Sequence, residues 1–379
     1  MKKIAVFHPY FLGGGAETVA LWILQALQDQ YEITLFTIGK IDFESLNLMY
    51  GTSLSNQSVK VINLVPDFFS HISYFLIANN KEMRMLFLHL LMRFFKKNSH
   101  NYDLVLSAYN AMDLGKIGIQ YIHMTKVLEG TSFYRKISTF SEEQIPKNIS
   151  IANSYHIANR AKEIYGVDAK VVFPPVVMNI QNIPWSEKEN AFICSGRIVK
   201  AKEPHRVIKI LKLVREQGFD VKLHITGGGG GVYGWQYNNL IKKLVEENSS
   251  WITLHKGLPY EEYTQLLAKC KYGIHYKKEP FGISIAEMVK AGAIPFVRSQ
   301  GGQVEIVGQH NDELFFNNEQ EAVDKIINVL SNPLKQNQLV ASLTTQINLF
   351  STHKFMSEIS EVVSSYFEGN VVVPTTLAI

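Results

Sequence analysis

The same succession of elements occurs twice along the chain: a short apolar strand, a glycine-rich loop and an amphipathic helix. Residues 3–7 (KIAVF) predict a buried strand, the loop LGGGAE follows it, and EITLFTI predicts a second strand soon afterwards. The segment between the loop and the second strand gathers apolar side chains on one helical face: Ala16, Val19, Ala20, Ile23, Leu24 and Leu27. Strands that alternate with helices in this way are typical of a parallel sheet covered by helices.

The pattern starts again after a polar stretch that ends near Asn190. AFICSG predicts a strand, and EPHRVIKILKLVREQG predicts a helix with Pro204 in its first turn and Gly218 as its stop. The next strand, VKLHIT, runs directly into the glycine run at 227–231. We therefore predict an α/β protein with two doubly wound, Rossmann-like domains, at 1–175 and 186–350, and a cleft between them.

Length and charge agree with two domains and exclude some partners. A chain of 379 residues exceeds what one hydrophobic core usually supports, and 46% hydrophobic residues suffice for two cores. Lys and Arg total 38 against 34 Asp and Glu, without long basic runs, so we expect no nucleic-acid partner.

The cysteines and the apolar segments bear on the compartment. Cys194 and Cys270 lie in apolar segments without metal-ligand spacing, which predicts reduced core residues of a cytoplasmic protein. The apolar stretch at the start, MKKIAVFHPY, is too short for a signal peptide. Residues 83–97 are apolar, but Arg84, His89 and Arg93 interrupt them and prevent them from spanning a bilayer. We expect a cytoplasmic protein that is soluble or rests on the inner face of the membrane.

Both glycine runs follow predicted strands. In doubly wound sheets ligands bind beyond the carboxyl ends of the strands, where glycines let backbone amides approach a phosphate. One such run alone indicates only a tight turn, whereas two in corresponding places indicate a ligand held between the domains. Neither run is a convincing G-x-G-x-x-G, and the strand ending in TIGK lacks the acid that would hold a ribose, which argues against NAD.

Two carboxylates flank a predicted helix start in KKEPFGISIAEMVKAGAIPFV. If the helix begins near Gly282, the amides of Phe281, Gly282 and Ile283 are its unpaired first-turn donors and suit a diphosphate. Glu287 lies about one turn later and reaches a ribose hydroxyl, while Glu279 faces the group on the far phosphate. The spacing suits a nucleotide-sugar, although taken alone it also fits two solvated glutamates.

This segment, with SQGGQVEIVG after it, resembles the donor-binding motif of the family 4 glycosyltransferases, enzymes of the GT-B fold with two facing Rossmann-like domains. SGRIVKAKEP is similar to the family segment whose Arg and Lys hold the diphosphate, here Arg197 and Lys202, with Lys200 as a competitor for the second role. One departure is Glu203, an extra carboxylate beside the phosphates, which we interpret as a helix-start charge that points away.

The resemblance implies a role for each of these side chains. Glu279 would bind hydroxyls of the transferred sugar, Glu287 those of the ribose, and Arg197 with Lys202 the charge on the departing diphosphate. His123, which ends the strand IQYI, resembles a family histidine that contacts the donor sugar, although a lone histidine is more often structural. The glycines expected to contact the donor are Gly14, Gly15, Gly227, Gly228, Gly282, Gly301 and Gly302. The sequence has no D-x-D motif after a strand, so we expect no metal and no other cofactor, and the family's reaction retains the anomeric configuration.

The finer resemblance is to the α-1,2-mannosyltransferases that extend lipid-linked oligosaccharide from GDP-mannose, which makes GDP-mannose the first expected donor and a UDP-sugar the second. The expected acceptor is a glycan or a lipid-linked glycan. Residues 83–97 either rest on anionic lipid or pack on the first sheet. In this fold a C-terminal helix, here about 352–368, crosses back to the first domain. A nucleotide-sugar epimerase and a catalytically silent nucleotide-sugar-binding protein remain alternatives.

Overall fold

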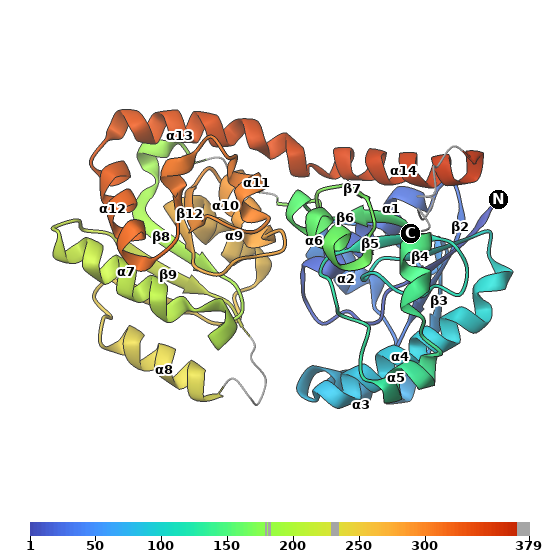
Figure 1. Ribbon diagram of the computed structural model, residues 1–379. Helices are drawn as coiled ribbons and strands as arrows, with labels where there is room; N and C mark the ends of the chain where they lie inside the picture. The colour runs from blue at the N-terminus through green and yellow to red at the C-terminus, as the bar shows by residue number, and fades with distance from the viewer. Residues whose placement is uncertain (179, 181–182, 229–234, 370–379) are drawn as a thin grey trace. The chain divides into compact units, whose positions relative to one another are not determined.

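The computed structural model describes residues 1–178, 180, 183–228 and 235–369. The chain divides into two compact units, Met1–Val177 together with Ser351–Ile379, and Met178–Phe350 (Figure 1). The first unit thus ends two residues beyond the predicted boundary at 175 and takes up the C-terminal segment. Each unit is a parallel sheet covered by helices, as the alternating pattern predicts.

The first unit contains a seven-stranded parallel sheet with the order β3-β2-β1-β4-β5-β6-β7. Its strands are β1 (Lys3–Phe7), β2 (Glu32–Thr37), β3 (Val59–Asn63), β4 (Leu104–Ser107), β5 (Ile119–Ile122), β6 (Ile149–Ala152) and β7 (Ala169–Val171). The strand order reverses between β1 and β4. Such a switch point is where doubly wound sheets bind ligands.

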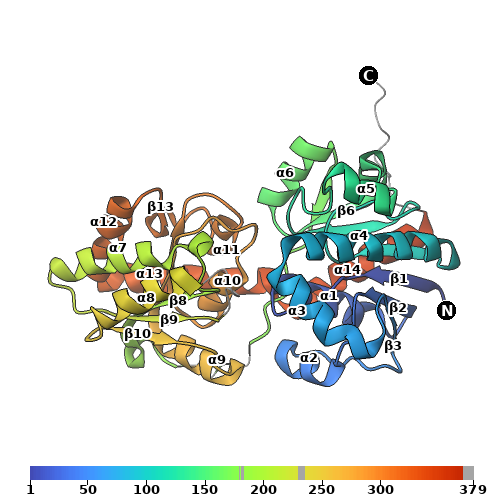
Figure 2. The same ribbon diagram turned by 90° about the horizontal axis from the view of Figure 1, so that it is seen from below.

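Helices cover both faces of this sheet, and residues of one strand point to both sides. Ile4 and Val6 of β1 pack toward α1 (Gly15–Leu27) and α14 (Thr352–Glu368), whereas Ala5 and Phe7 pack toward α4 (Lys81–Asn98). Figures 1 and 2 show α14 beside α1, with α3 (Ser70–Asn79) and α4 on the opposite face. The other α-helices of this unit are α2 (Phe43–Tyr50), α5 (Ser132–Ser138) and α6 (Tyr155–Tyr165), and its short 3-10 helices are η1 (Asp67–Phe69), η2 (Ser99–Asn101) and η3 (Glu142–Lys147).

The helix that includes residues 83–97 packs on the sheet. Four apolar side chains of α4 are buried in the core, namely Leu88, Leu91, Met92 and Phe95. Of the apolar side chains of α4 only Leu90 is exposed, at 37%, whereas the preceding η1–α3 segment exposes four large ones: Phe68, Phe69, Ile72 and Phe75. Within the described residues, the structure has no helix with both the length and the apolar character needed to cross a bilayer.

The second unit contains a six-stranded parallel sheet with the order β10-β9-β8-β11-β12-β13. Its strands are β8 (Glu189–Ser195), β9 (Lys222–Thr226), β10 (Ile252–His255), β11 (Cys270–His275), β12 (Ile294–Arg298) and β13 (Phe315–Phe316). Its helices are α7 (Pro204–Glu216), α8 (Trp235–Glu246), α9 (Tyr260–Lys269), α10 (Ile283–Lys290), α11 (Gln303–Val307), α12 (Glu319–Leu330) and α13 (Pro333–Gln346). The order reverses between β8 and β11, so the loops after these two strands meet at the switch point.

Candidate active site

Glu279 occupies the loop between β11 and α10 and is held by two neighbours. The Nε2–H of His275 donates to Glu279 Oε1 at 2.8 Å, and Lys202 Nζ lies 2.6 Å from the same oxygen. The Glu279 backbone amide donates to the side-chain oxygen of Gln303 at 2.8 Å, and Gln303 is fully buried. The structure therefore brings together two of the predicted residues, Glu279 and Lys202, and adds His275 and Gln303 to them.

These contacts keep the Glu279 carboxylate ionised. Burial alone would raise its pKa, but the hydrogen bond and charge of His275, together with Lys202, outweigh burial and lower the pKa to about 2. An ionised carboxylate only accepts hydrogen bonds. Glu279 is thus a fixed acceptor for hydroxyl groups at neutral pH.

Helix α10 starts directly after this loop. Gly282 is its N-cap with φ of 113°, a conformation that favours glycine, and the helix begins at Ile283, where the sequence pattern placed it. The first-turn amides of a helix have no acceptor within the helix and attract anions. Phe281 is buried at 3% exposure beside this start.

Glu287 lies one turn into α10 and is paired with a tyrosine. The Tyr263 hydroxyl donates to Glu287 Oε2 at 2.8 Å. Burial raises the Glu287 pKa to about 7, and the hydrogen bond from Tyr263 only partly opposes that shift. This carboxyl group therefore changes its charge near neutral pH, unlike Glu279.

The β8–α7 loop carries the predicted cations. Arg197 and Lys200 are exposed, whereas Lys202 is half-buried against Glu279. The extra carboxylate, Glu203, turns to Arg206 at 2.9 Å, within the first turn of α7. It therefore pairs with an arginine rather than standing alone at the helix start.

The glycines after β8 and β9 allow two backbones to approach closely. A Cβ atom on Gly227, whose φ is 149°, would lie 1.9 Å from the carbonyl oxygen of Gly196. Gly228 faces open space. The remaining predicted glycines of this run, 229–231, lie outside the described residues.

Gly301 and Gly302 lie against the backbone of the Glu279 loop. The Gly302 amide donates to the Glu279 carbonyl oxygen at 2.8 Å. A Cβ atom on Gly302 would lie 2.2 Å from the Pro280 carbonyl oxygen, and one on Gly301 would lie 2.7 Å from that of Glu279. Because neither residue has a side chain, the backbone of the Glu279 loop can lie this close to both glycines.

In the first unit, the predicted Gly14 and Gly15 begin α1 and are organised by Glu17. Glu17 is buried and accepts hydrogen bonds from the amides of Leu12 (2.6 Å) and Gly13 (2.9 Å) and from the Tyr50 hydroxyl (3.0 Å). Tyr50 also accepts from the Gly14 amide at 3.2 Å. The sequence GGGAE contains this glutamate, but only the fold shows that it fixes the loop.

His8 directly follows β1 and His123 directly follows β5, and β4 lies between these two strands in the first sheet. His123 Nε2 lies 3.1 Å from the Ala108 carbonyl oxygen, which can only accept, so Nε2 carries the proton and Nδ1 is left as an acceptor. Burial lowers the His123 pKa to about 4 and the His8 pKa to about 3, so both rings are neutral at pH 7. Neither ring nitrogen of His8 has a hydrogen-bond partner among the described residues.

Two Rossmann-like units, one of which holds a carboxylate–lysine pair ahead of a helix start, form the GT-B fold. Residues 178–343 match the family model "Glycosyl transferases group 1". The second unit thus belongs to this family, the family 4 type.

A curated relative from Dictyostelium discoideum, "GDP-Man:Man(3)GlcNAc(2)-PP-Dol alpha-1,2-mannosyltransferase", is 24% identical over 278 residues. The alignment covers 69% of this chain and 53% of the relative, so the chain spans about half the length of that protein.

Solved structures share the fold. HepE from Anabaena in complex with UDP-glucose has a TM-score of 0.68 at 19% identity, covering 96% of this chain and 100% of that one. WaaG, a glycosyltransferase involved in lipopolysaccharide biosynthesis, has a TM-score of 0.67 at 14% identity, covering 95% and 99%.

Proposed function

We propose that this glycosyltransferase moves a sugar, with retention, from a nucleotide-diphosphate donor to a glycan or lipid-linked glycan. The first donor we propose is GDP-mannose, after the name of the Dictyostelium relative, and the second is a UDP-sugar, after the HepE complex. The observation that carries the proposal is the ionised Glu279, fixed by Lys202 and His275 directly ahead of α10.

In this mechanism the donor lies along the start of α10. The first-turn amides and Arg197 hold the diphosphate, the Glu287 carboxylate accepts from the ribose hydroxyls, and Glu279 accepts from hydroxyls of the sugar. The bond from the anomeric carbon to the diphosphate oxygen breaks, and a bond to the acceptor oxygen forms on the same face. The acceptor's hydroxyl proton passes to the departing phosphate oxygen, so no further acid or base is needed.

We propose that cationic side chains stabilise the leaving diphosphate without a metal ion. Arg197, Lys200 and Lys202 all lie on the β8–α7 loop, which follows a strand at the switch point. If these side chains suffice, an excess of EDTA will change the transfer rate by less than about twofold. Such a change corresponds to well below 1 kcal/mol in the activation free energy. A rate that depends on added Mg²⁺ or Mn²⁺ would contradict this part of the proposal.

We also propose that His123 contacts the donor sugar through Nδ1. The ring is neutral, and Nδ1 is the nitrogen that Ala108 leaves as an acceptor for a hydroxyl group. His123→Ala should lower kcat without changing donor-independent properties such as the melting temperature of the second unit.

We also propose a peripheral membrane contact, and we place it on η1–α3 rather than on residues 83–97. Helix α4 buries four apolar side chains in the core, whereas Phe68, Ile72 and Phe75 of η1–α3 are 75%, 58% and 64% exposed. Flotation with vesicles of anionic phospholipid should therefore weaken in a Phe68→Ser/Phe75→Ser variant. Equal flotation of both proteins, or none, would remove this contact.

The experiment that tests the function combines donor binding and turnover. GDP-mannose, UDP-glucose, UDP-N-acetylglucosamine and NAD are compared by thermal shift, and nucleotide release is then measured with and without glycan acceptors. Nucleotide release that requires an acceptor supports transfer. Conversion of the donor without an acceptor would favour an epimerase, and binding without any turnover would favour a silent binder.

A further inference from the structure

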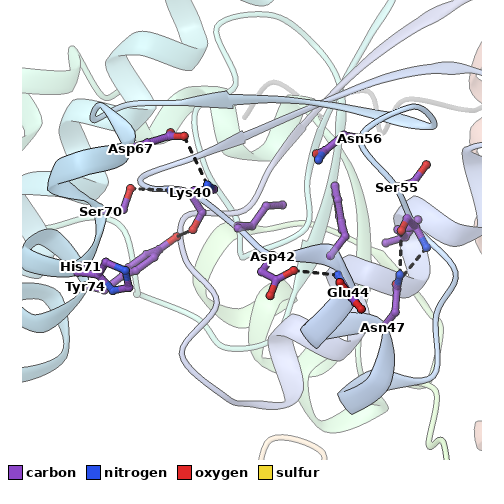
Figure 3. Close-up of a pocket in the computed structure, with 13 residues that line it drawn as sticks. Lys40, Asp42, Glu44, Asn47, Ser55, Asn56, Asp67, Ser70, His71 and Tyr74 are labelled. Carbon is purple, nitrogen blue, oxygen red and sulfur yellow. Dashed lines mark hydrogen bonds and ion pairs between the residues drawn. The ribbon is translucent and has the colours of Figure 1, made fainter.

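A cavity of about 720 Å³ lies in the first unit, and none of its lining residues is assigned above to the donor. One wall is formed by η1–α3, which follows β3, and Lys40 lies beside it (Figure 3). The other wall is formed by the start of α2 and by residues 54–56, and residues 40–44, which follow β2, connect the two. Residues 40–44 and η1–α3 thus lie beyond the carboxyl ends of parallel strands, where doubly wound sheets bind ligands, while residues 54–56 precede β3. Its volume falls in the range of small-molecule sites, about 300–1,000 Å³.

Backbone-directed hydrogen bonds fix the shape of the cavity. Ser70 Oγ accepts from the Lys40 amide at 2.8 Å, and the Tyr74 hydroxyl donates to the Lys40 carbonyl oxygen at 3.1 Å, so α3 is tied to the loop after β2. On the other side, Asp42 caps α2 by accepting from the Glu44 amide at 3.1 Å. The two walls are therefore formed before any ligand arrives.

The lining combines apolar and polar side chains. Phe43 and Leu54 are buried and Ile41 is half-buried, which gives an apolar surface. Exposed polar groups surround it, and in the described part of the chain the side chains of Glu44 and His71 have no hydrogen-bond partner. A sugar ring has the matching chemistry, because its C–H face is apolar and its rim carries hydroxyls.

The charge of the lining selects against a phosphate. Three carboxylates, Asp42, Glu44 and Asp67, face one lysine, Lys40, whose Nζ is 4.0 Å from Asp67. A diphosphate would meet an excess of negative charge here, in contrast to the three cations on the β8–α7 loop. A neutral polyhydroxylated ligand fits this balance, because carboxylates accept hydroxyl hydrogen bonds.

We propose that this cavity binds a neutral saccharide unit of the acceptor glycan. The assignment of this saccharide to the acceptor rests on the proposed function, but saccharide binding itself can be tested without any donor. The sugar's apolar face would lie toward Ile41 and Phe43, and its hydroxyls would donate to Asp42 and Glu44 and form a hydrogen bond with His71.

The first test measures saccharide binding alone. Methyl α-mannoside and α-1,2-mannobiose are titrated into the full chain while the methyl NMR signals of Ile41 and Leu54 are followed, with inorganic pyrophosphate as the anionic probe. We expect saturable shifts with the sugars, with a dissociation constant in the millimolar range, about −4 kcal/mol, and none with pyrophosphate. Unchanged signals with both sugars, or shifts with pyrophosphate, would overturn the inference.

Variants of surface residues then separate this site from the donor site. Glu44→Gln and His71→Ala should each weaken sugar binding about fivefold, roughly the value of one lost hydrogen bond, with melting temperatures near that of the wild type. Lys60→Gln, an exposed change on β3 outside the cavity, is the matched control and should bind sugar normally.

The same variants should raise the acceptor KM while donor-dependent nucleotide hydrolysis stays at the wild-type rate. Wild-type acceptor KM in both variants would overturn the acceptor assignment. Absence of turnover with every donor, while the sugars still shift Ile41 and Leu54, would instead contradict the proposed function and leave the saccharide site standing.

Discussion

Lys202 Nζ lies 2.6 Å from Glu279 Oε1, so the lysine proposed for the diphosphate is already paired with the carboxylate proposed for the sugar. The pair is mostly buried, with the two side chains 21% and 10% exposed. Removal of either partner leaves a charge that water solvates poorly. The two residues should therefore act as a unit, and a bound donor must share Lys202 with Glu279.

Glu279→Gln should lower the rate of sugar transfer at least about 100-fold, the typical loss when a positioned electrostatic group is removed. Glutamine keeps the size of the side chain but not its charge, so the protein should remain folded. Steady-state transfer assays and circular dichroism check both points. Glu262→Gln, an exposed change on α9, is the control, and wild-type transfer by Glu279→Gln would refute the assignment.

Donor affinity should depend on pH through Glu287. Its pKa is raised to about 7 in the free protein, and a ribose hydroxyl binds the ionised form best. Donor dissociation constants should fall as pH rises toward about 7 and level off above it, with up to about tenfold change per pH unit on the acid side. Calorimetric titrations from pH 5.5 to 8.5 measure the profile.

The raised pKa of Glu287 also makes the stability of the free protein depend on pH, in the opposite direction to donor affinity. The folded state holds the Glu287 proton more tightly than the unfolded state, so stability should decrease as pH rises from the ordinary value of 4.5 to about 7. Glu287→Gln should flatten both profiles. A donor-affinity profile that keeps its slope in this variant would assign the titration to another group.

Glu17→Ala should destabilise the first unit by about 2–3 kcal/mol, because hydrogen bonds to a charged group are worth about 1.5–3 kcal/mol. It removes the acceptor for the Leu12 and Gly13 amides and for the Tyr50 hydroxyl. Urea unfolding of Glu17→Ala, Tyr50→Phe and the double variant measures the coupling. Strictly additive effects would show that the two side chains do not stabilise the loop together.

Phe355→Ala should destabilise the first unit by about 3–5 kcal/mol, the usual loss for a buried phenylalanine. The side chain lies in α14, 1% exposed, within the core that α1 covers. His353→Ala on the exposed side of the same helix is the control and should change the melting temperature little. If both variants melted like the wild type, α14 would not be part of that core in solution.

Periodicity and glycine position predicted most strands and the start of α10, because buried parallel strands and helix caps have local signals. The Lys202–Glu279 contact joins positions 77 residues apart. No local pattern reveals that distance, and the positioning roles of His275, Gln303 and Tyr263 stayed hidden for the same reason. For residues 83–97 the sequence left two alternatives open, and the structure shows α4 packed on the sheet. Helix α3 and its exposed apolar side chains were not predicted.

The first unit receives its last helix, α14, from residues that follow the whole second unit in the chain. On the ribosome, Met178–Phe350 can complete its own core as soon as it emerges, while the amino-terminal sheet still lacks Phe355 and its neighbours. The first unit is thus the first to be synthesised but the last to complete its core. A truncated translation product would carry a formed second unit attached to a sheet with an exposed apolar face, and quality-control proteases would recognise that face.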